Sequence, residues 1–174
     1  PYLMGGFSGG GISAYEIARQ LREEGDEIAS LIMLDTPLPR RRKLTKGDRI
    51  KIQLQRLAEE GPARIWRTIS NRIAWEIDRR RAKEFETETT EFHNASIEAA
   101  FYEAIAKYEV VDWTGPLQLF RPPLAKKWKV GEDTWVSEAR EFLTHTNDWD
   151  KHVDDVIVHE VPGDHDSMVL EPNV

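Results

Sequence analysis

Apolar residues along the chain follow two patterns, short continuous runs and longer stretches with helical spacing. Short runs begin at Tyr2 and Ile28 and return at residues 117–121 and 156–161. Between the first two runs, residues 12–24 place apolar side chains largely on one face before a stop at Gly25. Strand, helix and strand in this order predict a right-handed crossover, and continuous apolar strands are typical of parallel sheets. The pattern therefore predicts an α/β fold with a mostly parallel sheet.

Residues 40–112 differ, because they contain no apolar run of strand length and helical spacing dominates. One helix is expected to open at residues 44–48, a second to begin at Pro62, and a third to span about residues 94–108. We interpret residues 40–112 as a helical lid insertion in a core formed by residues 1–39 and 113–174. The apolar positions of the three helices are Ile50, Leu54 and Leu57, then Ile65, Ile69, Ile73 and Ile77, then Ile97, Phe101 and Ile105.

The sequence begins almost directly on its first strand. A central parallel strand needs neighbours on both sides, yet only one good partner follows nearby. We therefore expect this chain to be the C-terminal portion of a larger domain, with the N-terminal strands missing from it. Towards the other end, residues 124–152 have a mixed pattern, in which a short helix is expected near residues 137–143.

The first strand leads into Gly6-Phe7-Ser8-Gly9-Gly10, a Gly-x-Ser-x-Gly motif followed by a helical pattern. This context is typical of a nucleophile elbow, a sharp strand-to-helix turn that holds a serine in a strained conformation. Gly6 and Gly10 flank the turn, and we expect that a Cβ at either position would collide with the neighbouring strand or helix. Ser8 is thus a candidate nucleophile and the Gly9 N–H a candidate oxyanion donor. A phosphate-binding loop is disfavoured, because neither Gly-Lys-Ser/Thr nor the dinucleotide spacing follows.

A serine nucleophile needs a base, and the base needs an acid that orients it. His165 is the candidate base, because it follows the last strand at the sheet edge that also carries Ser8. Asp35 is the preferred acid, because it ends the strand next to the elbow, although Asp is also common where a turn starts. Glu132 and Asp133, in the loop after residues 117–121, are the alternatives. The remaining histidines, expected at surface or packing positions, are His93, His145, His152 and His159.

Composition narrows the function classes further. The formal net charge of −7 over 174 residues argues against a nucleic-acid-binding protein, and the absence of cysteine excludes disulfides. No apolar run reaches the length of a membrane helix, and we take the cytoplasm as the default location. Residues 40–83 depart from the overall balance, with 15 Lys or Arg against five Asp or Glu. This charge either solvates helix faces or forms a docking surface for an acidic partner.

Several short motifs occur together from the elbow to the final loop. They are Gly5-Gly6-Phe7-Ser8-Gly9-Gly10-Gly11, Ala14-Tyr15-Glu16, Ala18-Arg19-Gln20-Leu21, Leu34-Asp35, and Val161-Pro162-Gly163-Asp164-His165 with Met168 and Pro172. In this combination the chain resembles the α/β-hydrolase thioesterase domains that terminate modular polyketide and nonribosomal peptide synthases. The resemblance covers essentially the whole chain, although the lid sequence matches nothing specific.

The resemblance implies that Ser8, Asp35 and His165 act as nucleophile, orienting acid and general base. It implies an acyl chain held as a thioester on the phosphopantetheine of an acyl or peptidyl carrier protein, released by hydrolysis or macrocyclisation. Neither a metal nor a cofactor of its own is expected, nor a nucleic-acid or membrane partner, and a homodimer stays open. The second oxyanion donor is expected outside this chain, and the basic lid is a candidate carrier-docking surface. A free-standing esterase, an editing thioesterase and a non-catalytic binding module of the same fold are the alternatives.

Overall fold

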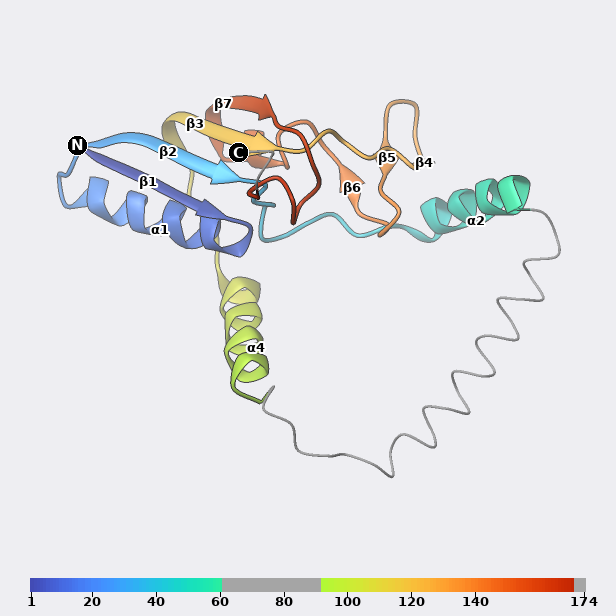
Figure 1. Ribbon diagram of the computed structural model, residues 1–174, viewed down its shortest axis with the longest axis horizontal. Helices are drawn as coiled ribbons and strands as arrows, with labels where there is room; N and C mark the ends of the chain where they lie inside the picture. The colour runs from blue at the N-terminus through green and yellow to red at the C-terminus, as the bar shows by residue number, and fades with distance from the viewer. Residues whose placement is uncertain (61–91, 171–174) are drawn as a thin grey trace.

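The structure, a computed structural model, describes residues 1–60 and 92–170. Figure 1 shows a central sheet with a helix along it, a smaller sheet beside it, and further helices away from the central sheet. The helix expected from Pro62, and the basic residues 79–83, lie outside the described residues. Within the described part, no helix is long and apolar enough to cross a membrane.

The central sheet contains four parallel strands in the order β1-β2-β3-β7, as the apolar runs predicted. β3 and β7 begin earlier than those runs indicated, because Trp113 pairs with Val153 ahead of a register shift that ends at Pro116. The polar residues at this shift interrupt the apolar pattern and hide the start of the strand. The four strands are β1 (Tyr2–Phe7), β2 (Ile28–Leu34), β3 (Trp113–Arg121) and β7 (Val153–Glu160).

β1 forms one edge of the described sheet. Its Leu3 side chain is 73% exposed, which is unusual for an apolar residue of an elbow strand. The expectation that further strands pair with this edge is not tested within the described residues and stays a prediction.

Helix α1 (Gly9–Glu23) connects β1 to β2 and packs along both strands (Figure 1). It begins at Gly9, earlier than the apolar pattern indicated, because the turn at Ser8 opens directly into the helix. Tyr15 and Ala18 on its buried face belong to one core with Leu31 and Met33 of β2. This shared apolar core fixes α1, and with it the turn before the helix, on the sheet.

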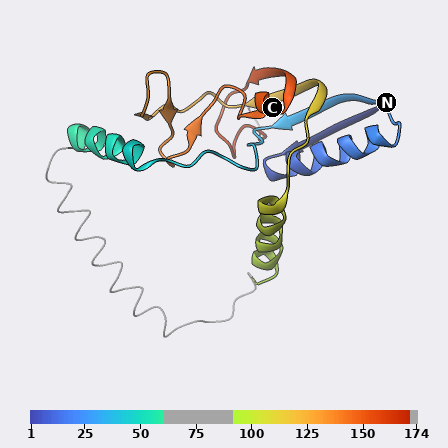
Figure 2. The same cartoon turned by 180° about the vertical axis from the view of Figure 1, so that it is seen from behind.

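A helix and several short strands lie beside the central sheet (Figure 2). Their side chains form a second, smaller core. In this core, Ile52 of the helix α2 is buried with Trp128, Val130 and Val136. The apolar positions expected for this helix, Ile50, Leu54 and Leu57, are instead exposed. The elements around this core are α2 (Lys46–Glu60) and the antiparallel strands β4 (Trp128–Lys129), β5 (Trp135–Val136) and β6 (Phe142–Leu143).

The short helix expected near residues 137–143 is wrong. The chain there forms a tight turn, in which the Arg140 N–H donates to Ser137 O at 3.0 Å and Arg140 has a φ of 65°. β6 follows this turn, and its Phe142 packs against the second core. A segment this short forms too few hydrogen bonds to nucleate a helix alone, so the tertiary contact of Phe142 decides its conformation.

Helix α4 (Phe92–Lys107) lies close to the range expected for the third lid helix and extends away from the sheet (Figure 1). Just after it, the Tyr108 hydroxyl donates to Glu16 of α1 at 2.8 Å. The Tyr15 hydroxyl donates to Val111 O at 2.6 Å. Burial and the Glu16 contact raise the pKa of Tyr108, so its hydroxyl stays protonated and able to donate. These bonds anchor the C-terminal end of α4 to α1.

The carboxyl ends of the four parallel strands lie in register with one another. Phe7 pairs with Leu34, Leu34 with Phe120, and Phe120 with His159. The residues that follow this row emerge side by side, at the edge where ligand sites of parallel sheets lie. The candidates that follow the row are Ser8, Asp35 and the loop that carries His165.

Candidate active site

Ser8 forms the turn between β1 and α1 in a strained conformation, with φ 52° and ψ −125°. A positive φ is costly for a residue with a Cβ and persists only where surrounding contacts maintain it. Here the Ser8 N–H donates to Leu34 O of β2 at 2.8 Å, which holds the turn against the sheet. The serine is therefore presented just beyond the strand ends, as expected for a nucleophile elbow.

The glycines around the turn permit close packing, but not at both of the expected positions. A Cβ on Gly6 would lie 2.3 Å from Gly10 O, so a side chain there is excluded. The collision expected at Gly10 is wrong, because a Cβ there would meet nothing within 4 Å. Gly11 is the tight position instead, since its Cβ would stand 1.9 Å from Thr36 Oγ1. The helix thus approaches the end of β2 through Gly11, one residue later than the motif suggests.

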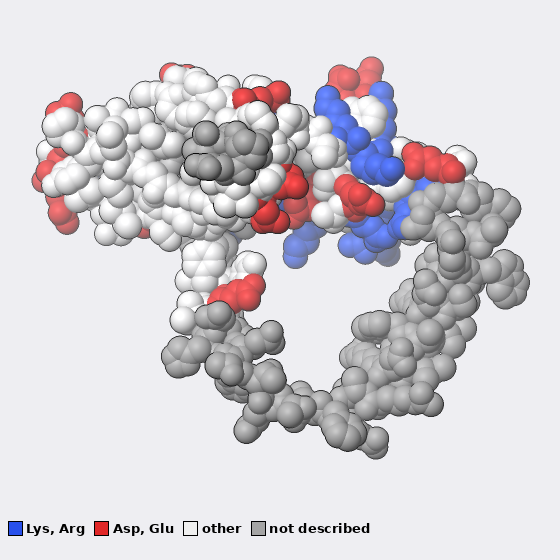
Figure 3. Space-filling view, in the orientation of Figure 1, with Lys and Arg blue, Asp and Glu red and all other residues white. Residues whose placement is uncertain are grey.

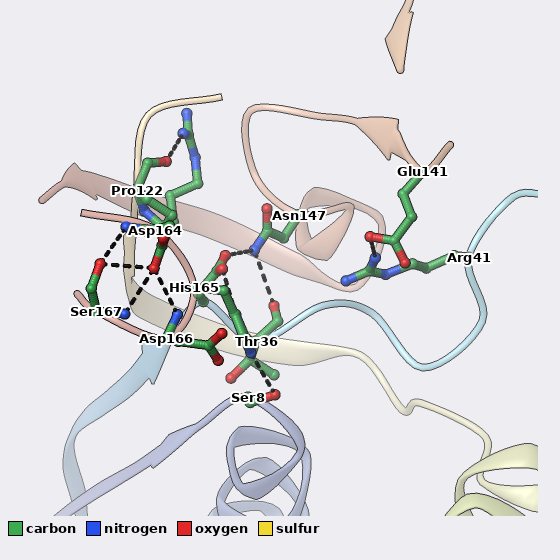
Figure 4. Close-up of polar contacts among 12 residues, drawn as sticks. Ser8, Thr36, Arg41, Pro122, Glu141, Asn147, Asp164, His165, Asp166 and Ser167 are labelled. Atoms are coloured by element: carbon green, nitrogen blue, oxygen red, sulfur yellow. Dashed lines mark hydrogen bonds and ion pairs between the residues drawn. The ribbon is translucent and has the colours of Figure 1, made fainter. Parts of the chain in front are cut away.

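His165 lies within hydrogen-bonding distance of both Ser8 and Asp35. Figure 4 shows its contact with Ser8. Its Nε2 is 3.1 Å from Ser8 Oγ, and its Nδ1 is 2.8 Å from Asp35 Oδ2. An ionised carboxylate only accepts hydrogen bonds, so Nδ1 carries the proton and Nε2 faces the serine hydroxyl as an acceptor. In this arrangement an imidazole can remove the proton of a serine hydroxyl.

Asp35 follows β2 directly and has a φ of 41°. Its N–H donates to Phe120 O of β3 at 2.7 Å, which fixes the start of the loop. The alternative acids, Glu132 and Asp133, lie in the turn between β4 and β5 of the small sheet. The carboxylate that contacts His165 is that of Asp35.

The loop that carries His165 is organised by Asp164. The Asp164 carboxylate accepts from the N–H groups of Asp166 at 3.2 Å and Ser167 at 2.9 Å, and from the Ser167 hydroxyl at 2.7 Å. Hydrogen bonds from Ser167 hold the pKa of Asp164 below its usual value, so the carboxylate stays ionised near neutral pH. A charged Asp164 therefore shapes the turn that presents the imidazole (Figure 4).

Two neighbours of the candidate triad were not predicted from the sequence. The ring of Phe7 stacks on His165, and the Asn147 amide donates to Asp35 Oδ1 at 3.0 Å. Phe7 occupies a variable position of the Gly-x-Ser-x-Gly motif. Only its aromatic character could have indicated a contact with the ring of His165. Asn147 and Asp148 precede Trp149 in a pair that is typical of a turn, which gave no indication of a contact with Asp35.

Three other histidines make contacts outside the triad. His145 Nδ1 lies 3.0 Å from Arg121 Nη2, His152 Nδ1 lies 2.9 Å from Asp112, and His159 Nε2 lies 2.6 Å from Gln118 Oε1. The side chain of His93 lies outside the described residues. Within residues 1–60 and 92–170, no group of three His, Cys, Asp or Glu side chains is placed to hold a metal ion.

A cavity of about 1000 Å³ opens beside Ser8. One wall is the sheet edge with the candidate triad, and another is α4, which contributes Phe101, Tyr102 and Ile105. Arg41 of the remaining wall forms an ion pair with Glu141 at 2.6 Å (Figure 4). This volume is at the upper end of the range for small-molecule pockets. The basic residues that line the cavity are Arg41, Arg42, Lys43, Arg49 and Arg140.

Gly9 is the first residue of α1, so its N–H has no carbonyl partner within the helix. An N–H in this position beside a serine is suited to bind an oxyanion. Phe101 of α4 covers the same residue, because a Cβ on Gly9 would stand 2.7 Å from its ring carbons. Helix α4 therefore contacts the turn that carries the candidate nucleophile.

Comparison with curated proteins finds short stretches of high similarity to polyketide synthases. Over 39 residues the chain is 62% identical to the non-reducing polyketide synthase PKS16 of Cladonia grayi, which covers 22% of this chain and 2% of that protein. Over 40 residues it is 55% identical to the conidial pigment polyketide synthase alb1 of Aspergillus fumigatus, again 22% of this chain and 2% of the relative. The matched stretches are thus a small part of much longer proteins.

Solved structures and a family model match nearly the whole chain. The NocB thioesterase domain, in covalent complex with a fluorophosphonate nocardicin G analogue, aligns over 99% of this chain and 60% of its own, with 23% identity and a TM-score of 0.55. The four-domain nonribosomal peptide synthetase AB3403 aligns over 99% of this chain and 13% of its own, with 24% identity and a TM-score of 0.57. These likenesses show the α/β-hydrolase fold.

The family model described as Thioesterase domain matches residues 1–172. It spans the elbow, the strands β1 and β2, and the loop after β7. These parts bring Ser8, Asp35 and His165 together. The chain therefore belongs to the thioesterase domain family.

Proposed function

We propose that this domain releases an acyl chain from a carrier protein through a covalent ester on Ser8. His165 accepts the Ser8 proton while Oγ attacks the thioester carbonyl, and the thiol then leaves with the proton that His165 returns. A water molecule, or a hydroxyl or amine of the acyl chain itself, next attacks the ester with His165 again as base. The products are a free acid or a closed ring, and Ser8 is restored.

The observation that carries this proposal is the position of His165, 3.1 Å from Ser8 Oγ and 2.8 Å from Asp35 Oδ2. In the proposed mechanism, Asp35 holds the Nδ1 proton and offsets the charge of the imidazolium. The Gly9 N–H is proposed to donate to the tetrahedral oxyanion.

The proposed substrate is an acyl thioester on the phosphopantetheine arm of an acyl or peptidyl carrier protein, and the domain needs no cofactor of its own. Membership of the thioesterase family supports thioester chemistry. The similarity to polyketide synthases favours a polyketide over a peptide chain. The cavity of about 1000 Å³, with Phe101 and Ile105 along one wall, suits a long and partly apolar acyl group.

Three measurements test the chemistry. A fluorophosphonate probe is expected to label Ser8 in the intact protein, with the label mapped by mass spectrometry, and Ser8→Ala is expected to remove both the label and the turnover. Turnover of acyl groups loaded on a carrier domain is compared with turnover of small acyl esters. The mass of the released product separates the two outcomes. A free acid is heavier by one water molecule than the ring closed from the same acyl chain.

The alternatives predict different results. A free-standing esterase would hydrolyse small esters with no preference for carrier-bound chains. An editing thioesterase would remove short or aberrant acyl groups faster than the full-length chain. A non-catalytic binding module would leave Ser8 unlabelled in the intact protein, and that result would overturn the proposal.

We further propose that the carrier docks on a basic surface formed by α2 and β4. Figure 3 shows Lys and Arg atoms gathered over this end of the molecule. The basic residues expected at positions 79–83 lie outside the described residues, so the described part of the surface carries the argument. An acidic carrier would be attracted to it at low ionic strength. The exposed residues that define this basic surface are Lys46, Arg49, Lys126, Lys127 and Lys129.

Charge reversal tests the docking proposal. Lys46→Glu combined with Lys126→Glu is expected to raise the KM for the carrier-bound substrate and to flatten its dependence on salt. The kcat on a small thioester is expected to stay unchanged. Lys107→Glu, an exposed reversal at the end of α4, is the matched control. An unchanged KM and salt response in the double variant would rule out this surface as the docking site.

A further inference from the structure

Asn147 contacts the candidate catalytic acid through the carboxylate oxygen that His165 does not contact. Figure 4 shows the hydrogen bonds of its amide. Its Nδ2 lies 3.0 Å from Asp35 Oδ1, while the other carboxylate oxygen, Oδ2, receives the His165 bond at 2.8 Å. The same Nδ2 lies 3.4 Å from Thr36 O. Each oxygen of the Asp35 carboxylate therefore has its own donor, and the plane of the carboxylate is held between them.

The orientation of the Asn147 amide follows from its neighbours. Both groups that face it, the Asp35 carboxylate and the Thr36 carbonyl, are acceptors. Only the NH₂ end of the amide can satisfy them, because the carbonyl end would place oxygen against oxygen. Asn147 is thus a donor to a charged group, and such bonds are stronger than those between neutral groups.

The backbone around Asn147 is arranged to make this contact. Asn147 and Asp148 have positive φ values, 50° and 71°, in the left-handed region that Asn and Asp tolerate better than other residues with a Cβ. The Leu38 N–H donates to Asn147 O at 3.2 Å, and the Trp149 indole donates to Thr36 O at 2.9 Å. Trp149 is fully buried, so this second bond is shielded from water. The turn is therefore fastened to the segment that directly follows Asp35.

We propose that Asn147 is a positioning residue for the thioesterase reaction. It holds Asp35 so that Oδ2 points at His165 Nδ1. Asn147 touches neither the acyl group nor the thiol and acts through Asp35. This inference rests on the proposed function, because it assigns a role within the same catalytic site.

Two variants separate the donor from the shape of the turn. Asn147→Asp keeps the size of the side chain and its tolerance of a positive φ but removes the amide donor. Asn147→Gly suits the same backbone conformation and removes the side chain entirely. Thr146→Val is the matched control, because it removes the Thr146 hydrogen bond to Asp150 in the same turn without touching Asp35.

The readouts are the rate of fluorophosphonate labelling at Ser8 in the intact protein, and kcat and KM on a small acyl thioester. Both Asn147 variants are expected to lower the labelling rate and kcat about 10- to 100-fold with KM nearly unchanged, as for loss of a hydrogen bond to a charged group. Thr146→Val is expected to match the wild type. The activity of Asn147→Asp relative to wild type is expected to recover as the pH falls, because a protonated carboxyl at position 147 can donate to Asp35.

Several results would overturn the inference. Wild-type labelling rates in folded Asn147→Gly or Asn147→Asp would show that the amide does not position Asp35. An equal loss in Thr146→Val would show that any loosening of the turn has the same effect, and a pH-independent deficit in Asn147→Asp would remove the donor argument. Absence of label on wild-type Ser8 would instead contradict the proposed function itself, and with it any positioning role.

Discussion

The ring of His165 stacks on the ring of Phe7, with their centroids 4.9 Å apart and their planes 28° apart. Phe7 is the last residue of β1 and directly precedes Ser8. The ring of the residue before the candidate nucleophile therefore packs against the ring of the candidate base. Because Phe7 also pairs with Leu34 in the sheet, the imidazole rests on a rigid part of the fold.

Loss of this stack should weaken catalysis modestly. Phe7→Leu keeps an apolar side chain at the strand end but removes the aromatic face, and we expect kcat to fall about two- to tenfold, from the strength of an aromatic pair. The measurement is kcat on a small acyl thioester, with thermal unfolding as a check on the fold. Phe7→Tyr keeps the ring and should stay near the wild-type rate. Equal rates in Phe7→Leu and wild type would mean that the stack does not hold His165.

Asp35→Asn should lower turnover by about 10⁴-fold, because an amide in place of the carboxylate favours the wrong imidazole tautomer. The folded state should persist, since the Asp35 N–H bond to Phe120 O belongs to the backbone. Steady-state kinetics measure the effect. The companion variants Glu132→Gln and Asp133→Asn should keep full activity, because both residues lie in the β4–β5 turn. A large loss of turnover in either companion variant, with near-normal turnover in Asp35→Asn, would assign the role of orienting acid to that residue instead of Asp35.

Thr36→Val should stabilise the fold. Thr36 is fully buried, and its hydroxyl has no hydrogen-bond partner among the described residues. An unsatisfied buried hydroxyl is destabilising, so an isosteric methyl group should raise the free energy of unfolding by about 1 kcal/mol. Urea unfolding measures this change. Thr36→Ser, which keeps the hydroxyl and loses the methyl group, should be less stable than wild type, and the opposite order would contradict the argument.

Glu16 should make stability depend on acid pH. Its carboxylate accepts hydrogen bonds from Arg19, Gln20 and Tyr108, and the bonds from Arg19 do most to lower its pKa, to about 2 from an ordinary 4.5. Because the pKa is lowered on folding, the ionised group stabilises the protein fully above pH 4.5, and this contribution is lost as the pH falls towards about 2. Glu16→Gln should therefore be less stable than wild type at neutral pH.

The measurement for Glu16 is the free energy of unfolding of both proteins across this pH range. The difference between wild type and Glu16→Gln should shrink steadily as the solution becomes more acidic. Glu23→Gln is a suitable control, since Glu23 also pairs with Arg19 but is more exposed. A difference between wild type and Glu16→Gln that stays constant with pH would show that the carboxylate charge is not the stabilising element.

Local patterns predicted the sheet and the candidate triad, whereas long-range packing was beyond them. The strand over residues 28–34 and the turn at Ser8 depend on constraints that act within a few residues, and both could be read directly. Asp35 was preferred over Glu132 and Asp133 because it directly ends a strand, and its carboxylate is the one that contacts His165. The catalytic roles of these residues stay predictions until they are measured.

The sequence-based predictions that were wrong share one physical cause. In each case, a contact with a residue far away in the sequence determines the local structure. Helix α2 buries Ile52 rather than Ile50, Leu54 and Leu57, because β4 and β5 supply the apolar surface on that side. Gly11 rather than Gly10 is sterically tight, because Thr36 at the end of β2 packs against it. Asn147 reaches Asp35 across more than a hundred residues of sequence, and no local pattern contains that contact.

The backbone bonds at the strand ends connect chemistry to folding. The Ser8 N–H donates to the last residue of β2, and the Asp35 N–H donates to the next strand at Phe120. The candidate nucleophile and the candidate acid therefore continue the backbone hydrogen bonding that forms the sheet. If that hydrogen bonding opened at the strand ends, both side chains would lose their places at once. Heat inactivation should therefore coincide with melting of the sheet, and a folded but inactive intermediate should not accumulate.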